Sequence, residues 1–271
     1  MTRFDRDTSV RRAADGAFDV CIERAWWVVM GPNGGYLAAL AVHALEAAVG
    51  DAGRAPRSLT LHFVETAVEG PARVHVRLER SGRSLSALSA RLEQDGRLIA
   101  LALATFGHAR ERLEFQDLHM PDVPPPESLA SRRPLGGNAA PIREHFETRP
   151  VLGSLEPGST SRALVGAWLR LAEPRVPDAA ALAMFCDSLP PAIAQREAFG
   201  PNGIRGVPTI DLTVHFRAPL PESARPDDFY LCIFRTQTAR DGFLEEDGEI
   251  WAPDGTLLAQ SRQLATIMPM G

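Results

Sequence analysis

The sequence predicts an α+β protein of two similar modules, each a curved antiparallel sheet wrapped around one central helix. Three observations predict this fold class. The chain contains an internal repeat, the first copy holds one largely apolar helical segment, and each copy ends in a meander of segments with strong β character. A length of 271 residues suits two modest domains.

The internal repeat has two collinear parts. LTLHF at 59–63 recurs as LTVHF at 212–216, an offset of 153, and QDGRLIA at 94–100 recurs as PDGTLLA at 253–259, an offset of 159. An Asp-Gly hairpin turn stands in both copies of the second part. Two matches in the same order indicate a duplication, with about six extra residues in the second copy near 226–228.

The first copy contains every element of the predicted module. The apolar residues of its helical segment cover too wide a surface for a solvent-exposed helix, so we expect that helix to be buried. In order, the expected elements are a strand at 18–22, a glycine-rich turn at 31–35, a helix at 36–49, and strands at 58–64, 72–80, 85–93 and 98–106.

The second copy repeats this order, and a sheet wrapped around a helix in this way is the hotdog fold. Its expected elements are strands at 145–149 and 163–171, a helix at 189–198, and strands at 208–217, 229–237, 242–251 and 256–267. A proline-rich stretch separates the copies, since proline blocks helix and central strand alike. The predicted domains are therefore an N-terminal module at 1–110, a linker at 111–143 and a C-terminal module at 144–271.

Composition narrows the class of protein. A formal net charge of −5 gives no basic field that would attract nucleic acid or an anionic membrane. The polar N-terminus is no secretory signal, and no apolar run reaches the roughly 20 residues of a membrane helix. We expect a soluble cytoplasmic protein. Cys21, Cys186 and Cys232 match no metal or disulfide spacing, and we expect them to be small buried residues.

Five segments resemble the acyl-CoA thioesterase II family, in order along nearly the whole chain outside the linker. They are GPNGGYLAAL at 31–40, RSGRSLSA at 80–87, CDSLP at 186–190, TIDLTVHFR at 209–217 and AQSRQ at 259–263. The resemblance implies a double hotdog that hydrolyses acyl-CoA thioesters in lipid metabolism. It implies no metal and no cofactor beyond the CoA of the substrate, and a homo-oligomer, dimeric or larger.

The resemblance also implies the site residues. Asp187, Thr209 and Gln263 match the Asp, Thr and Gln with which that family holds a hydrolytic water. A carboxylate can accept the proton of the water, while a hydroxyl and an amide can orient it. Helix N-terminal amides can stabilise the oxyanion. Asn33, Gly34, Gly35 and Tyr36 are the expected substrate contacts.

Structural roles compete with these assignments. Asp187 would precede the predicted helix and could be its N-cap. Asp211 is a rival carboxylate, because strict alternation places Thr209, Asp211 and His215 on one face of a strand and the apolar residues on the other. His62 and His215 occupy equivalent repeat positions, which favours a scaffold role. Gln263 has Ala104 as its first-module counterpart, which predicts one working site.

Other functions stay open at this level. A non-hydrolytic protein that binds acyl-CoA or acyl-carrier thioesters would keep the fold without the chemistry. Hydration or dehydration of acyl thioesters is a further alternative, although the paired Asp and His that it requires is absent. The glycine run lacks a Walker lysine and a dinucleotide fingerprint, and there is no Gly-x-Ser-x-Gly elbow of a serine hydrolase.

Overall fold

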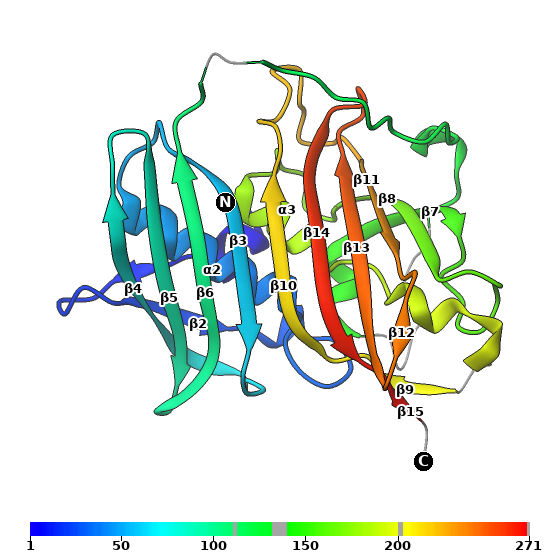
Figure 1. Cartoon of the computed structure of the whole chain (residues 1–271), viewed down its shortest axis with the longest axis horizontal. Coiled ribbons are helices and arrows are strands. Elements are labelled where there is room, and N and C mark those ends of the chain that lie inside the picture. The colour runs from blue at the N-terminus through cyan, green and yellow to red at the C-terminus, as the bar shows by residue number, and fades with distance from the viewer. Residues whose placement is uncertain (111–112, 132–139, 200–202, 270–271) are drawn as a thin grey trace.

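A computed structural model of the chain describes residues 1–110, 113–131, 140–199 and 203–269. The strands of both modules form one continuous antiparallel sheet (Figure 1). The first module contributes β1 (Arg11–Arg12), β2 (Phe18–Ile22), β3 (Ala55–Phe63), β4 (Gly70–Ser81), β5 (Leu85–Gln94) and β6 (Arg97–Gly107). The second contributes β7 (Phe146–Gly153), β8 (Leu164–Leu171), β10 (Thr209–Phe216), β11 (Tyr230–Arg235), β12 (Ala239–Arg240), β13 (Phe243–Trp251) and β14 (Leu257–Thr266). A separate pair is formed by β9 (Ile204–Gly206) and β15 (Met268–Pro269).

The strand order shows that the two modules are copies. The sheet runs β1-β2-β4-β5-β6-β3 through the first module and then β10-β14-β13-β11-β8-β7 through the second, so each module has the same order read outward from its centre. The repeated segments themselves meet there, with Thr60 directly opposite Thr213 and their hydroxyls 3.0 Å apart. A pseudo-twofold axis therefore passes through the β3–β10 pair, which supports the predicted duplication and double hotdog.

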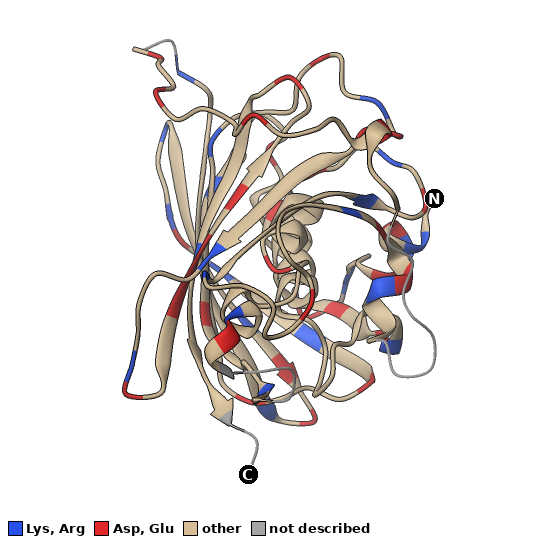
Figure 2. Ribbon diagram, turned by 90° about the vertical axis from the view of Figure 1, so that its right-hand side faces the viewer, with Lys and Arg blue, Asp and Glu red and all other residues tan. Residues whose placement is uncertain are grey.

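The helices cover one face of this sheet, behind it in Figure 1 and to one side of it in Figure 2. The long helix α2 (Gly34–Val49) packs against α3 (Ala179–Phe185). Asn33 caps α2 by accepting a hydrogen bond from the Tyr36 N–H at 3.0 Å, and Gly50 ends it in the left-handed conformation. As its apolar pattern predicts, α2 is buried along most of its length.

The helix predicted at 189–198 is wrong, and the helix of the second module lies earlier, at α3. Asp178 caps α3 by accepting a hydrogen bond from Ala181 N, and an apolar alanine-rich run follows. Pro190 and Pro191 prevent the helix from continuing, because proline removes an N–H and disfavours helix in the residue before it. Residues 192–199 form short 3-10 turns instead, η4 (Ala192–Gln195) and η5 (Glu197–Phe199).

The connection between the modules packs on the outer face of the second module. Met120, Val123 and Leu129 rest on a small apolar cluster that includes Trp168, and the Trp168 indole donates to the Pro124 carbonyl at 2.9 Å. Two 3-10 turns, η2 (Pro126–Ser128) and η3 (Pro141–His145), lie along this connection. Pro134, Gly136 and Gly137 of the predicted linker fall outside the described residues.

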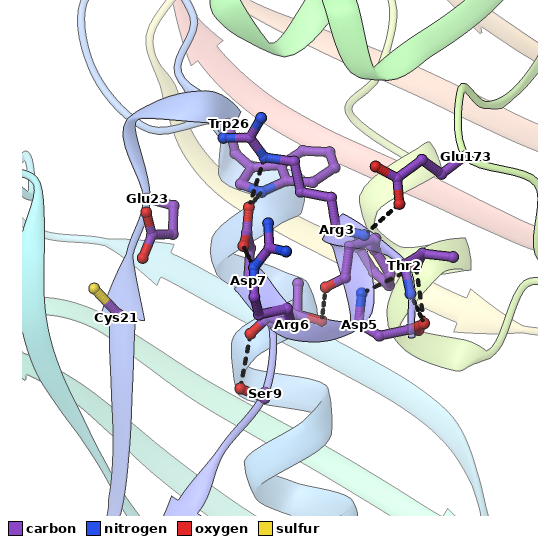
Figure 3. Close-up of polar contacts among 12 residues, drawn as sticks. Thr2, Arg3, Asp5, Arg6, Asp7, Ser9, Cys21, Glu23, Trp26 and Glu173 are labelled. Atoms are coloured by element: carbon purple, nitrogen blue, oxygen red, sulfur yellow. Dashed lines mark hydrogen bonds and ion pairs between the residues drawn. The ribbon is translucent and has the colours of Figure 1, made fainter.

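The N-terminal segment ties the two modules together. Within the short helix α1 (Arg3–Asp7), the Asp7 carboxylate accepts from the Trp26 indole at 3.0 Å. The Arg3 backbone N–H donates to Glu173 of the second module at 2.6 Å, and Figure 3 shows α1 between these two partners. Trp26 closes the short 3-10 turn η1 (Arg24–Trp26). Cys21 is exposed, contrary to the expectation of burial, whereas Cys186 and Cys232 are buried.

Candidate active site

Asp187 lies where the end of α3 meets the start of α2. Its Oδ2 accepts hydrogen bonds from Asn33 Nδ2 at 2.8 Å and from the Gly35 N–H at 3.0 Å. Asn33 Nδ2 also donates to the Asp187 carbonyl at 2.7 Å. Asp187 therefore does not cap a helix of its own, as the sequence allowed. It is a second-module carboxylate held at the helix N-terminus of the first module.

Gln263 extends the site from the inner face of β14. Its Nε2 donates to Asp187 Oδ1 at 3.2 Å and to the Cys186 carbonyl at 3.3 Å. Its Oε1 accepts from the Thr209 hydroxyl at 2.8 Å. Both N–H groups of the amide are thus engaged, and Gln263 links Thr209 to the carboxylate. The three predicted catalytic side chains form one hydrogen-bonded chain.

A β-bulge places Thr209 in this chain. Strict alternation puts Thr209 on the same face as Asp211, away from the core. The register between β10 and β14 shifts between these two residues, with Thr209 opposite Ala265 but Asp211 opposite Leu264. The extra residue turns Thr209 to the inner face, where Gln263 lies. The face predicted for Thr209 is therefore wrong.

The two glycines at the start of α2 allow a close approach. A Cβ on Gly35 would lie 2.7 Å from the Met184 carbonyl oxygen of α3, and a Cβ on Gly34 would lie 3.0 Å from Asp187 Oδ2. Only glycine lets α3 and the carboxylate reach the α2 N-terminus. The Gly35 N–H, predicted to face substrate, is already engaged by Asp187.

Tyr36, predicted to contact substrate, has its side chain elsewhere. The ring is completely buried and stacks on Trp26. Its hydroxyl donates and accepts within the N-terminal half of the module, 2.9 Å from the carbonyl oxygens of Asp7 and Cys21 and 3.2 Å from the Glu23 N–H. The structure therefore brings Asn33, Gly34 and Gly35 to the candidate site, but not the Tyr36 ring.

The environment of Asp187 raises its pKa. Burial is the main cause, and hydrogen bonds from Gly35, Gln263, Gly34 and Asn33 oppose it. Within the described ranges, no arginine or histidine forms an ion pair with Asp187, whereas Glu147, on β7, is paired with Arg149 and Arg170. The neighbouring Cys186 thiol is buried too, which raises its pKa to about 12 and keeps it neutral. This chemistry suits a general base and not a thiolate nucleophile.

Other candidates lie on the opposite face of the sheet. Asp211, His62 and His215 alternate with core residues along β3 and β10, and both histidines are exposed. Asp211 accepts a hydrogen bond from the Leu264 N–H at 3.3 Å. The rival carboxylate is therefore separated from Asp187 by the sheet.

The pseudo-equivalent position in the first module lacks this machinery. Gln263 corresponds to Ala104 at the offset of 159, and Thr209 corresponds to Pro56 at the offset of 153. At the pseudo-equivalent place, the residue that caps α3 is Asp178, and it lies 3.7 Å from His43 Nε2. In the candidate site, the residue that caps α2 is Asn33, and it contacts Asp187. The amide and hydroxyl of the site are present once.

Glu246 is the residue that sequence reasoning missed. It lies on β13 directly opposite Gln263 and is 7% exposed, and its Oε2 accepts from the Ala192 N–H at 2.6 Å. Alternation within β13 could have identified it, because Glu246 shares the inner face with Leu244, Gly248 and Ile250. A carboxyl group among apolar inward residues is a candidate functional group.

Two kinds of feature do not occur among the described residues. No group of three or more His, Cys, Asp or Glu side chains has an arrangement that could hold a metal ion. No helix there is long and apolar enough to cross a membrane.

Comparisons with known proteins agree with this architecture. Residues 23–107 match the acyl-CoA thioesterase N-terminal domain, and residues 120–267 match the acyl-CoA thioesterase C-terminal domain. No curated protein matches the sequence.

Solved structures resemble the whole chain. A conserved hot dog protein of unknown function from Alicyclobacillus acidocaldarius is 28% identical, with complete coverage of both chains and a TM-score of 0.87. The acyl-CoA thioesterase II TesB2 from Mycobacterium marinum shares the fold at 22% identity, 99% coverage of each chain and a TM-score of 0.78. With both domain matches in order on a double hotdog, this chain belongs to the acyl-CoA thioesterase family.

Proposed function

We propose that this protein hydrolyses acyl-CoA thioesters to the free acid and CoA, using a water activated by Asp187 and oriented by Thr209 and Gln263. The observation that carries the proposal is the continuous chain from Thr209 through Gln263 to Asp187, with bonds of 2.8 and 3.2 Å. Family membership supports thioester hydrolysis in general.

The hydrogen-bond directions leave two oxygens of the site with acceptor capacity for a water. Thr209 donates its only hydrogen to Gln263, so its oxygen is free to accept. Asp187 Oδ1 accepts one bond from Gln263 and has further acceptor capacity. A water that donates one hydrogen to each of these oxygens presents its lone pair to a substrate carbonyl, and Gln263 orients that water by holding both oxygens in place.

The proposed reaction balances with these groups alone. The water oxygen bonds to the thioester carbon while Asp187 accepts a water proton, which gives a tetrahedral oxyanion. The oxyanion collapses, the C–S bond breaks, and Asp187 returns the proton to the departing thiolate. Burial, which raises the pKa of Asp187, makes the carboxylate a better base than an exposed aspartate.

The helix α2 supplies a positive field for the oxyanion. Its N-terminus points at the site, and 16 residues give it a developed dipole. Because the Gly35 N–H already donates to Asp187, its contribution is to hold the base in place. The Asn33 side chain caps this end of α2 through its oxygen and holds the Asp187 carboxylate through its nitrogen.

The proposal is tested by incubating the protein with saturated acyl-CoAs from acetyl to palmitoyl and measuring free thiol and free acid. We expect both products in equal amounts from at least part of the panel. If acyl-CoA raises the melting temperature but no thiol is released, the protein is a non-hydrolytic binder. A 2-enoyl-CoA and a 3-hydroxyacyl-CoA are tested alongside, and addition or loss of water there with the thioester intact would indicate a hydratase and overturn the proposal.

A further inference from the structure

Glu246 is a buried carboxyl group next to the candidate base. Gln263 separates the two acids, since it donates to Asp187 and lies directly opposite Glu246 on the neighbouring strand. Side chains directly opposite on antiparallel strands have Cβ atoms about 4.5–5.5 Å apart. Glu246 forms no ion pair within the described ranges, whereas Glu249 on the same strand pairs with Arg235 at 3.0 Å.

The first module shows that the fold does not require an acid here. The strand pair β13–β14 sets Glu246 opposite Gln263, and the equivalent pair β5–β6 sets Leu88 opposite Ala104. Leu88 is 1% exposed and occupies the core. Glutamate replaces this apolar residue only in the module that contains Asp187. Burial of an unpaired acid costs stability, so its presence beside the base points to a role in the site.

Two buried carboxylates on either side of one glutamine, with no ion pair to either among the described residues, would repel each other. The hydrogen bonds that each carboxyl group receives determine which of the two is ionised. Asp187 receives hydrogen bonds from Asn33, Gly35 and Gln263 and lies at a helix N-terminus, whereas Glu246 receives one, from Ala192. The negative charge therefore resides on Asp187, and the proton on Glu246.

We propose that Asp187 and Glu246 form a coupled acid pair that holds one proton at neutral pH, with Glu246 as the neutral member that positions the charge on the base. The pKa of Glu246 agrees with this, since burial raises it to about 8 and the charge of Asp187 adds to the rise. Glu245 is the other charged group acting on it. Gln263 and Ala192 carry no charge, and the Cys186 thiol stays protonated.

The pair has a consequence for the proposed hydrolysis, on which this step rests. Below about pH 8 Glu246 adds no charge to the site, so the oxyanion of the substrate meets only the neutralised base. Above that pH, ionised Glu246 opposes the oxyanion. The pair thus sets an alkaline limit on activity.

The first test needs no activity. Carboxyl carbons of ¹³C-labelled glutamate are followed by NMR from pH 5 to 10 in the full-length protein. We expect one resonance with a midpoint near pH 8 that is missing from Glu246→Gln and from Glu246→Leu, the residue of the first module. In Asp187→Asn its midpoint should fall by roughly one pH unit, because the repelling charge is gone. A glutamate that titrates in the ordinary range, or a midpoint unmoved by Asp187→Asn, overturns the pair.

The second test is the pH dependence of kcat/KM from pH 6 to 9.5, corrected for uncatalysed hydrolysis. We expect wild type to lose activity above pH 8 and Glu246→Gln to keep it at least tenfold better at pH 9.5. Glu249→Gln, which removes a buried carboxylate from the other face of β13, should keep the wild-type profile. The same alkaline loss in Glu246→Gln refutes the inference while leaving hydrolysis intact. An inactive wild type refutes the proposed function, and the NMR titration still decides the pair.

Discussion

The polar side chains of the candidate site are connected by hydrogen bonds. Asn33 caps α2 with its oxygen and holds Asp187 with its nitrogen, and Gln263 joins the carboxylate to Thr209. Such fully connected polar groups fix one geometry, because any rotation would leave a buried donor or acceptor unpaired. The oxygens with spare acceptor capacity, Thr209 Oγ1 and Asp187 Oδ1, are where the proposed water binds.

The Thr209 hydroxyl can be removed without changing the shape of the side chain. Thr209→Val should lower kcat roughly 10- to 100-fold, because both the water acceptor and the donor to Gln263 are lost. Thr209→Ser should restore most of the activity. Thr213→Val is the control, since Thr213 lies on the outer face of the same strand and contacts Thr60. Equal activity of Thr209→Val and wild type would exclude Thr209 from the site.

Gly35 tests the close approach of the helices. Gly35→Ala should reduce the free energy of unfolding by about 1–3 kcal/mol, because its Cβ would meet backbone atoms of Met184 that cannot rotate away. Urea unfolding measures the change. Gly82→Ala, whose Cβ would meet the Leu85 carbonyl at an ordinary 3.4 Å, should change it far less. Comparable losses in the two variants would contradict this account of the α2–α3 contact.

At the scale of elements, the sequence predicts those helices and strands that are determined by the pattern of neighbouring residues. The longer strands of both modules and the buried helix α2 were predictable because alternation, Asp-Gly turns and an apolar helical face are encoded in adjacent residues, whereas the two-residue strands β1 and β12 were not predicted. The predicted second helix, at 189–198, lies after Asp187, although Asp178 and the alanines that follow it have the features of an N-cap and a helix. The proline pair after Leu189 was the contrary signal.

The sequence predicted which residues form the candidate site better than it predicted how they are arranged. Resemblance to the family supplied Asp187, Thr209 and Gln263, which the structure brings together. The bulge before Asp211 depends on pairing with β14 and has no local signature, so alternation gave Thr209 the wrong face. The one sequence signal for Glu246 is that a charged residue interrupts the apolar inner face of β13.

The N-terminus of α3 has a measurable pH dependence. Burial acts to raise the pKa of Asp178, but the ion pair with His43 and the hydrogen bond from Arg175 hold it well below the ordinary 3.8. Its stabilising effect is therefore present above about pH 4 and lost as the pH falls. The pKa of His43 is raised overall, because the ion pair with Asp178 and the hydrogen bond to the Thr8 carbonyl outweigh burial. The stability contributed by protonated His43 is lost as the pH rises above 6.5, the ordinary pKa of histidine.

Asp178→Asn should consequently destabilise the protein most between about pH 5 and 6. The loss in the free energy of unfolding should be on the order of 1 kcal/mol, because the Asp178 side chain is 40% exposed and solvent screens its ion pairs. Urea unfolding at pH 3.5, 5.5 and 8 measures it, with the exposed Asp117→Asn as the control. Asparagine can keep the cap, so a loss independent of pH would contradict the role given to the ion pairs of Asp178.

At the scale of the whole molecule, a symmetric frame holds an asymmetric site. The axis between Thr60 and Thr213 relates two sheets of identical strand order, yet only one side has Gln263, Thr209 and Glu246 where the other has Ala104, Pro56 and Leu88. The site still needs both modules, because Asn33 and Gly35 come from the first and Asp187 from the second. Assembly into a homo-oligomer stays a prediction.

This sharing predicts that the modules unfold together. The continuous sheet, the α2–α3 contact and the N-terminal segment all join them, so we expect one cooperative transition in calorimetry, with calorimetric and van't Hoff enthalpies equal. Asn33→Ala should lower the midpoint without splitting the transition. Two separate transitions in the wild type would contradict the single cooperative unit.

The most direct test of the central claim is the rate of thiol release by Asp187→Asn relative to wild type, on the acyl-CoA that wild type cleaves best. We expect a loss of about 100-fold or more in kcat with a folded protein, because the amide cannot accept the proton of the water. Wild-type turnover by a folded Asp187→Asn variant would show that the reaction takes place without this carboxylate, and the proposed site would be wrong.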